Sequence, residues 1–133
     1  MEGPLAKVAQ LLSYIKYKGF TDTFKTMSEI DAFAKETDQL VWIYANWCGP
    51  CKNAKKDWQT TREFINMNNI KLKMQSIDGS VHQDVAKAFK ITGYPYFAIV
   101  KMKAANDKTL KIETVDCRDS NFLQKIKKEY SSS

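Results

Sequence analysis

The spacing of apolar residues along the chain predicts alternating strands and helices. A nearly continuous apolar run at 40–45 is typical of a strand that is buried on both faces. Residues 48–67 predict a helix that follows this strand directly. Apolar residues at 70, 72, 74 and 77 indicate a second strand, which ends at 78–80. Ser80 is then a candidate N-cap for a helix that carries apolar residues at 81, 85, 88 and 89.

The remaining segments complete the pattern. Residues 20–27 alternate Thr and Phe and suggest a first strand, after which Ser28 is expected to cap a helix that runs to about 36. Residues 96–100 and 110–114 predict a hairpin, and a last helix starts near 120. This order predicts an α/β domain with a mixed sheet of about five strands and helices on both faces.

The first 19 residues predict an amphipathic helix in addition to this domain. Apolar residues at 5, 8, 11, 12 and 15 follow helical spacing, while lysines at 7, 16 and 18 interrupt any block typical of a signal peptide or a membrane span. We therefore divide the chain into an N-terminal extension, 1–19, and a domain, 20–130. The apolar stripe is expected to pack on the domain, and a partner or membrane surface is the alternative.

The amino-acid composition and net charge narrow the classes of molecule that the chain is expected to bind. A net charge of +6 comes from 19 lysines and only two arginines, and arginine is the residue best suited to phosphate recognition. This balance favours general attraction to acidic partners over a nucleic-acid site. Three cysteines are too few for a disulfide-stapled scaffold, and their odd number fits a reducing compartment. We expect a cytoplasmic monomer that binds neither nucleic acid nor membrane.

The candidate chemistry lies in Trp47-Cys48-Gly49-Pro50-Cys51, between the buried strand and the helix. Cys48 is expected at the helix N-terminus, where unpaired N–H groups and the helix dipole stabilise a thiolate. Cys51 lies one turn further on and is placed to attack a mixed disulfide at Cys48. Gly49 lets a partner backbone approach closely, and Pro50 suits the start of a helix. The pattern predicts thiol–disulfide exchange, with a metal half-site or a purely structural pair as alternatives.

Together with Ile77-Asp78 and Thr92-Gly93-Tyr94-Pro95, this motif resembles the thioredoxin family over about 28–128. The resemblance implies the thioredoxin fold and a redox-active dithiol that needs no metal or bound nucleotide. It also implies a cis Tyr94–Pro95 bond that faces the cysteine pair and leaves the Tyr94 backbone free to pair with an extended substrate. The expected substrate-binding surface consists of Trp47, Gly49, Pro50, Tyr94, Pro95 and Asp116.

The chain departs from the family pattern at the residues that handle protons. Trp42 stands where the family has a buried Asp that assists proton transfer at the second cysteine, and Met74 stands where it has a buried Lys. Cys51 is therefore expected to rely on water for its proton, and apolar surroundings are expected to raise its pKa. Asp116 replaces a Gly in the loop before the last helix, where a carboxylate is expected to oppose a thiolate at Cys48.

The leading functional prediction is a protein-disulfide reductase. Cys48 attacks a substrate disulfide, Cys51 resolves the mixed disulfide, and a thioredoxin reductase or another dithiol donor supplies electrons. The alternative is a binding module of the same fold with little redox turnover, which the missing buried acid favours. A third hypothesis is an oxidase or isomerase in an oxidising compartment, but Gly-Pro between the cysteines accompanies reductases in the family.

Cys117 and His82 are two further candidates for a chemical role. Cys117 is either a third redox thiol or a small buried apolar residue, which is the commoner use of a free cysteine. His82, the only histidine, is expected to be solvated near a helix start rather than catalytic. A zinc site made of Cys48, Cys51, Cys117 and His82 lacks a second close pair of ligands, so no metal is expected.

Overall fold

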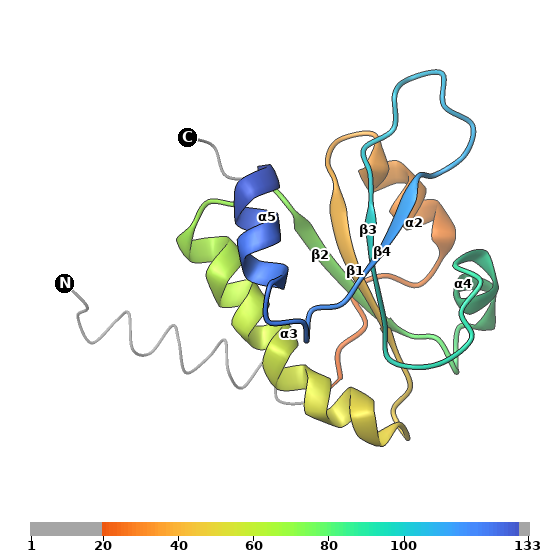
Figure 1. Ribbon diagram of the computed structural model, residues 1–133. Helices are drawn as coiled ribbons and strands as arrows, with labels where there is room; N and C mark the ends of the chain where they lie inside the picture. Colours follow the sequence, from red (N-terminus) through yellow and green to blue (C-terminus); the bar gives the residue numbers. More distant parts are fainter. Residues whose placement is uncertain (1–19, 131–133) are drawn as a thin grey trace, which may run out of the picture.

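A mixed sheet forms the centre of the molecule. The computed structural model describes residues 20–130, so the expected N-terminal helix at 1–19 lies outside the described residues. Within them the sheet has the order β2-β1-β3-β4 (Figure 1), and β1 runs parallel to β2 but antiparallel to β3, which is antiparallel to β4. The strands are β1 (Gln39–Tyr44), β2 (Lys73–Asp78), β3 (Tyr96–Val100) and β4 (Ile112–Val115).

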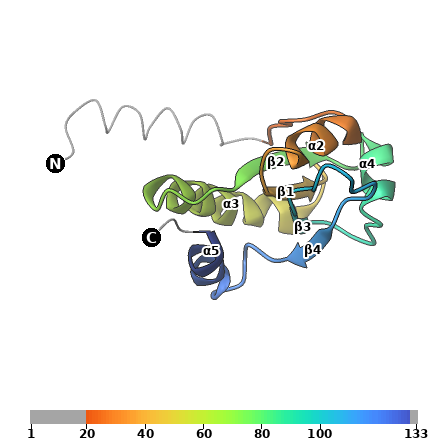
Figure 2. The same ribbon diagram turned by 90° about the horizontal axis from the view of Figure 1, so that it is seen from above.

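Helices cover both faces of this sheet, as predicted (Figure 2). One face carries α3 (Gly49–Met67) and α5 (Phe122–Tyr130), and the other carries α2 (Met27–Ala34) and α4 (Gln83–Ala88). Alternate side chains of β1 enter the two cores, with Trp42 on the α3 side and Ile43 on the α4 side. Burial on both faces explains why the apolar run of β1 is nearly continuous. None of the helices between residues 20 and 130 is long and apolar enough to cross a membrane.

The prediction of a first strand at 20–27 is wrong, and the described sheet has four strands rather than about five. Residues 21–23 instead run along the outer edge of β2 and bind it largely through side chains. Thr23 Oγ1 accepts the Ser76 N–H at 2.8 Å, and the Asp22 carboxylate accepts the Asp78 N–H at 2.9 Å. One backbone bond, from the Thr23 N–H to the Ser76 carbonyl at 2.7 Å, also joins the segment to β2. Side-chain acceptors therefore take the place of a strand ladder.

Two helix starts differ from the prediction. Thr26, not Ser28, is the N-cap of α2, and its N–H donates to the Glu29 carboxylate at 3.0 Å. The N-cap of α4 is His82, because the hydroxyl of Ser80 turns back to the carboxylate at the end of β2. Short polar side chains near a helix start compete for the same few N–H groups, so the pattern gives the helix but not its first residue.

Loops from different parts of the chain meet at one edge of the sheet and define the candidate site. The parallel strands β1 and β2 both end at this edge, and β3 starts there because it is antiparallel to β1. The loop after β1 leads into α3 at Cys48, and the loop before β3 contains Pro95. The strand order thus brings the predicted cysteine motif and the proline turn together. Cys48 and Pro95 are 47 residues apart in the sequence.

Candidate active site

Cys48 is the N-cap residue of α3. Its backbone is extended, with φ −83° and ψ 119°, and its Sγ accepts the Cys51 N–H at 3.2 Å. Pro50 occupies the first turn, where a missing N–H leaves no intrahelical bond unmade. The Cys48 sulfur therefore lies at the positive end of the helix dipole and accepts a backbone N–H, an arrangement that stabilises negative charge on the sulfur.

Cys51 lies deeper than Cys48 and is the better candidate for the resolving thiol. Cys51 is completely buried, whereas Cys48 is 6% exposed. Burial, followed by the hydrogen bond with the Cys48 sulfur, raises the pKa of the Cys51 thiol to about 12. Cys51 therefore stays protonated at neutral pH, which makes the less buried Cys48 the candidate for the first attack on a disulfide.

The predicted cis proline turn lies against this pair. The Tyr94–Pro95 bond is cis, and the Tyr94 carbonyl accepts a hydrogen bond from Cys48 Sγ at 3.6 Å. Tyr94 also meets the ring of Trp47 edge-on, with 5.9 Å between ring centroids. Trp47 is 67% exposed, and a Cβ added at Gly49 would meet no atom within 4 Å, so the surface around Cys48 is open to a partner chain.

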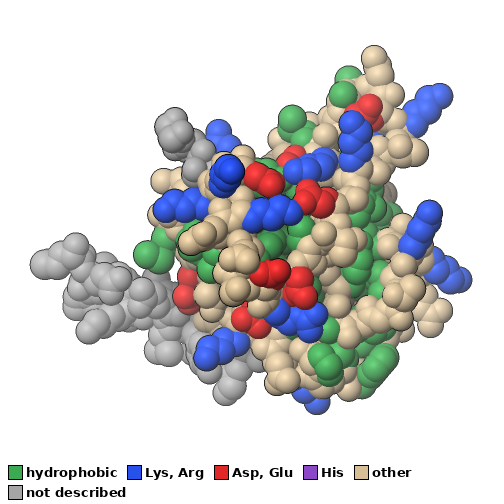
Figure 3. Space-filling view, in the orientation of Figure 1, with side chains coloured by type: hydrophobic (Ala, Val, Ile, Leu, Met, Phe, Trp, Pro, Cys, Tyr) green, Lys and Arg blue, Asp and Glu red, His purple; other side chains and the backbone are tan. Residues whose placement is uncertain are grey.

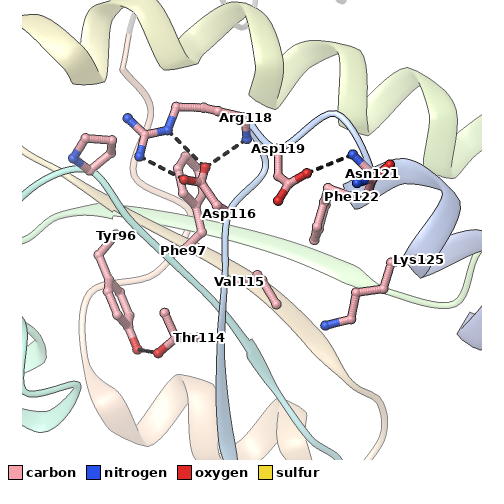
Figure 4. A pocket seen from close by; sticks show the side chains of 11 residues that line it. Tyr96, Phe97, Thr114, Val115, Asp116, Arg118, Asp119, Asn121, Phe122 and Lys125 are labelled. Atoms are coloured by element: carbon pink, nitrogen blue, oxygen red, sulfur yellow. Dashed lines mark hydrogen bonds and ion pairs between the residues drawn. The ribbon is translucent and has the colours of Figure 1, made fainter.

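Asp116 reaches the same edge from the loop between β4 and α5, but it is not an isolated carboxylate. Arg118 binds it with two side-chain bonds, from Nε to Oδ1 at 2.9 Å and from Nη2 to Oδ2 at 3.0 Å (Figure 4). The Arg118 N–H adds a third bond at 2.9 Å. These bonds hold the pKa of Asp116 below its usual value and compensate the charge that was expected to oppose a thiolate at Cys48.

Arg118 is the functional candidate that sequence reasoning missed. Its positive charge lowers the pKa of Cys51, against the larger effect of burial. The guanidinium also lies over the ring of Phe97, 5.9 Å from its centroid, and lines the same cavity as Pro95. The available signal was its place two residues after Asp116 in a chain with only two arginines. Only the loop conformation brings it toward the dithiol.

The place of the family's buried acid is filled by an aromatic cluster. Trp42 is buried, as predicted, and its indole Nε1 has no hydrogen-bond partner among residues 20–130. Met74 and Cys51 belong to the same packed core. Neither Trp42 nor Met74 can accept or release a proton near Cys51. The rings packed around Trp42, with centroids 5.0 to 6.1 Å away, belong to Phe20, Tyr44, Trp58 and Phe97.

Cys117 belongs to the same packed core as Cys48 and Cys51, whereas His82 lies elsewhere, beside Asp22. Cys117 is buried, and burial raises the pKa of its thiol well above the usual value, which suits a packing role. His82 Nε2 lies 3.7 Å from Asp22 Oδ2, at the outer edge of β2. Across the described part of the chain, no three or more His, Cys, Asp or Glu side chains are grouped so that they could hold a metal ion.

Comparison with known proteins agrees with this geometry. The family model described as Thioredoxin matches residues 21–129. A thioredoxin domain-containing protein 5 homolog from Drosophila melanogaster is 32% identical over 63 residues, which cover 47% of this chain and 15% of that protein. Protein disulfide-isomerase A6 from Mesocricetus auratus is 36% identical over 61 residues, which cover 45% of this chain and 14% of that protein. The chain thus matches only about one seventh of the length of either relative.

Solved structures resemble the whole described domain. Mitochondrial thioredoxin 3 from Saccharomyces cerevisiae, in its oxidised form, superimposes with a TM-score of 0.64 at 22% identity and covers 88% of this chain and 98% of its own. The thioredoxin from Trypanosoma brucei brucei gives a TM-score of 0.62 at 15% identity, with 85% and 92% covered. At these identities the likeness establishes the thioredoxin fold alone.

Proposed function

The chain belongs to the thioredoxin family, and on that premise we propose that it reduces protein disulfides through Cys48 and Cys51. The observation that carries the proposal is the placement of Cys48 at a helix N-terminus, above a buried Cys51 and beside a cis proline turn. Proteins of this family work through the dithiol itself, without a further cofactor.

The proposed reaction has two exchange steps. The Cys48 thiolate attacks one sulfur of a substrate disulfide, and the other substrate sulfur leaves as a thiolate. Cys51 then loses its proton to solvent and attacks Cys48 Sγ, so that the second substrate thiol is released and a Cys48–Cys51 disulfide remains. Two electrons from a thioredoxin reductase or another dithiol donor restore the dithiol. The Gly49-Pro50 pair between the cysteines supports the reductive direction, because it accompanies reductases in the family.

We also propose a monomer in a reducing compartment, the cytoplasm. The odd number of cysteines supports that compartment, because a secreted disulfide framework would pair them. Extended substrate chains are proposed to bind across Trp47, Gly49, Pro50, Tyr94, Pro95 and Asp116. The partners are then disulfide-containing proteins and the dithiol donor.

Insulin reduction with a chemical dithiol donor tests the activity. We expect turnover in the wild-type protein and none in Cys48→Ser. Alkylation of the reduced protein at neutral pH should modify Cys48 before Cys51, because Cys51 is buried and protonated. The absence of turnover with any dithiol donor, or faster alkylation of Cys51, would contradict the assignment. Cys51→Ser should retain substrates on Cys48 as mixed disulfides that can be identified.

A second candidate function is disulfide isomerisation or oxidation, which is favoured by curated relatives named protein disulfide-isomerase. The reduction potential separates it from the first candidate. A value near that of thioredoxin, about −270 mV, supports a reductase, whereas a value near that of protein disulfide isomerase, about −180 mV, supports the second candidate. A binding module with little turnover remains the other alternative, and undiminished partner binding by a Cys48→Ser, Cys51→Ser variant would support it.

A further inference from the structure

A cavity of about 380 Å³ adjoins the dithiol and has no role in the exchange steps. Two of its lining residues belong to the active-site rim. Trp47 directly precedes Cys48, and Tyr94 accepts the hydrogen bond from Cys48 Sγ. The opposite wall comes from α4 and the loop after it, through Lys87 and Lys90. A chain bound at Cys48 therefore has this cavity within reach of the residues that flank its cysteine.

Close packing at Gly79 fixes the aromatic wall of the cavity. A Cβ placed on Gly79 would lie 3.0 Å from Tyr94 Cε1 and 3.1 Å from the Tyr94 hydroxyl oxygen, so the Tyr94 ring rests directly on the Gly79 backbone. Trp47 meets this ring edge-on and is largely exposed. Two aromatic rings in edge-on contact give the cavity an apolar side, which is typical of binding pockets.

The charged side of the cavity is purely positive. Lys87 and Lys90 are exposed, and neither forms an ion pair with any residue from 20 to 130. No acidic residue lines the cavity. The nearest buried carboxylate, Asp78, accepts hydrogen bonds from Ser80 and from the Asn46 N–H instead. Two uncompensated ammonium groups beside aromatic rings complement a carboxylate on a short aliphatic stem.

We propose that this cavity binds an acidic side chain of the substrate, next to the cysteine that Cys48 attacks. Lys87 and Lys90 are then specificity-determining residues, while Trp47 and Tyr94 hold the aliphatic stem. The inference rests on the proposed disulfide exchange. It gives the tyrosine at 94 a role, because Tyr94 lines the cavity.

The test measures the first exchange step with matched peptides. A short peptide carries one cysteine, flanked on each side by Glu, Gln or Lys, in a disulfide with 2-thiopyridine. The Cys48 thiolate of a Cys51→Ser protein attacks the peptide sulfur, forms the mixed disulfide and releases thiopyridone, whose absorbance gives the rate. We expect the Glu peptide to react faster than the Lys peptide at low salt, and added salt to reduce the difference.

The decisive comparison uses two charge-reversal variants of equal net charge. Lys87→Glu with Lys90→Glu changes the cavity, whereas Lys108→Glu with Lys111→Glu changes the exposed loop between β3 and β4, at the opposite end of the sheet. The measured quantity is the rate with the Glu peptide divided by the rate with the Lys peptide. We expect this ratio to fall about fivefold further in the cavity variant than in the loop variant, which is the size of effect expected for two exposed charge pairs. Equal falls in both variants, or no preference in the wild type, would overturn the proposal.

Neutral 2,2′-dithiodipyridine separates this inference from the function on which it rests. We expect both variants to react with it at the unmodified rate, which also shows that their active sites are folded. If Cys48 of the unmodified protein fails to react, disulfide exchange itself is refuted, and the cavity proposal with it. Normal reaction with the neutral reagent but equal rates with all three peptides refutes the cavity proposal alone.

Discussion

At Cys51, influences that raise and lower the pKa of the thiol oppose each other, and burial is the largest of them. Burial disfavours the thiolate and raises the pKa, while the nearby Arg118 guanidinium favours the thiolate and lowers it. Asp116 holds that guanidinium through two side-chain bonds. With Trp42 in the place of the family's acid, the charge of Arg118 is the favourable electrostatic contribution that a side chain makes to the resolving thiolate.

Replacing Arg118 by Gln should therefore slow the resolving step. The loss of a positive charge raises the pKa of Cys51, so at pH 7 to 8 a smaller fraction of Cys51 is thiolate, and the mixed disulfide on Cys48 lasts longer. Because Arg118 is partly exposed, screening limits the expected effect to about two- to fivefold. Single-turnover kinetics of mixed-disulfide decay measure it.

The matched variants are Arg118→Lys, which keeps the charge and should restore part of the rate, and Lys127→Gln on the exposed side of α5, which should leave the rate unchanged. A merely structural role for Arg118 would move the unfolding free energy but not the pH dependence of resolution. Equal decay rates in wild-type and Arg118→Gln proteins would contradict the electrostatic role.

The dithiol was predictable from sequence because it is a local motif whose chemistry depends on neighbours in the chain, and the cis turn was expected because the resemblance to the thioredoxin family implies it. Arg118 was not, because its effect on Cys51 depends on how the loop after β4 folds back toward α3. The same reason explains Asp116, whose position was predicted but whose charge is compensated by a residue that the pattern did not single out.

At the level of elements, the contact between the ends of β1 and β2 allows the active-site loops to meet. Gly79 follows β2 directly, and its N–H donates to the Tyr44 carbonyl at 2.8 Å. A Cβ at this position would lie only 2.6 Å from Ile43 Cγ2, a core side chain that cannot retreat. The absence of a side chain at 79 is therefore a packing requirement rather than a need for an unusual φ.

Gly79→Ala should destabilise the fold by about 1 to 3 kcal/mol, the usual cost of forcing an extra methyl group into a filled core. Urea unfolding of the reduced protein measures the change. Gly93→Ala is the control, because a Cβ there meets no atom within 4 Å and the residue has no positive φ. It should shift the unfolding free energy by less than about 0.5 kcal/mol. Equal effects of the two substitutions would refute the packing argument.

The boundaries of β1, α3 and β3 were predicted closely because apolar runs and a proline at the helix start determine them locally. The segment before α2 was predicted wrongly as a strand, since its alternation of Thr and Phe suits a strand ladder. The structure uses the Thr and Asp side chains there as hydrogen-bond partners of β2 instead. Whether a polar side chain or the backbone makes such bonds depends on the tertiary neighbour, which a sequence pattern does not contain.

At the level of the whole molecule, charge is dispersed over the surface. On the face seen in Figure 3, basic side chains are interspersed with acidic ones rather than gathered into one patch. Inside, the Tyr44 hydroxyl donates to Asp22 Oδ1 and ties the segment before α2 to the central strand. Burial and this hydrogen bond raise the pKa of Tyr44 above its usual value.

Stability should consequently fall in alkaline solution. Above pH 10, the usual pKa of tyrosine, the unfolded chain releases the Tyr44 proton but the folded protein keeps it, so rising pH favours unfolding. One such proton contributes at most about 1.4 kcal/mol per pH unit. Urea unfolding between pH 8 and 11 should show a shallower decline for Tyr44→Phe than for the wild type. Parallel declines in the two proteins would contradict a raised Tyr44 pKa.

The side-chain bonds along the outer edge of β2 have a consequence for how the sheet opens. The amides of Ser76 and Asp78 are held by Thr23 and Asp22, whereas β1 holds the other edge of the same strand. Detachment of one short segment frees these two amides while the β1 pairing stays intact, so they should exchange with deuterium through a local opening rather than global unfolding. Thr23→Val should speed exchange at Ser76 and leave Ile77 protected. In that case residues 21–23 detach from β2 reversibly in a local opening of their own, and the core around the dithiol stays closed.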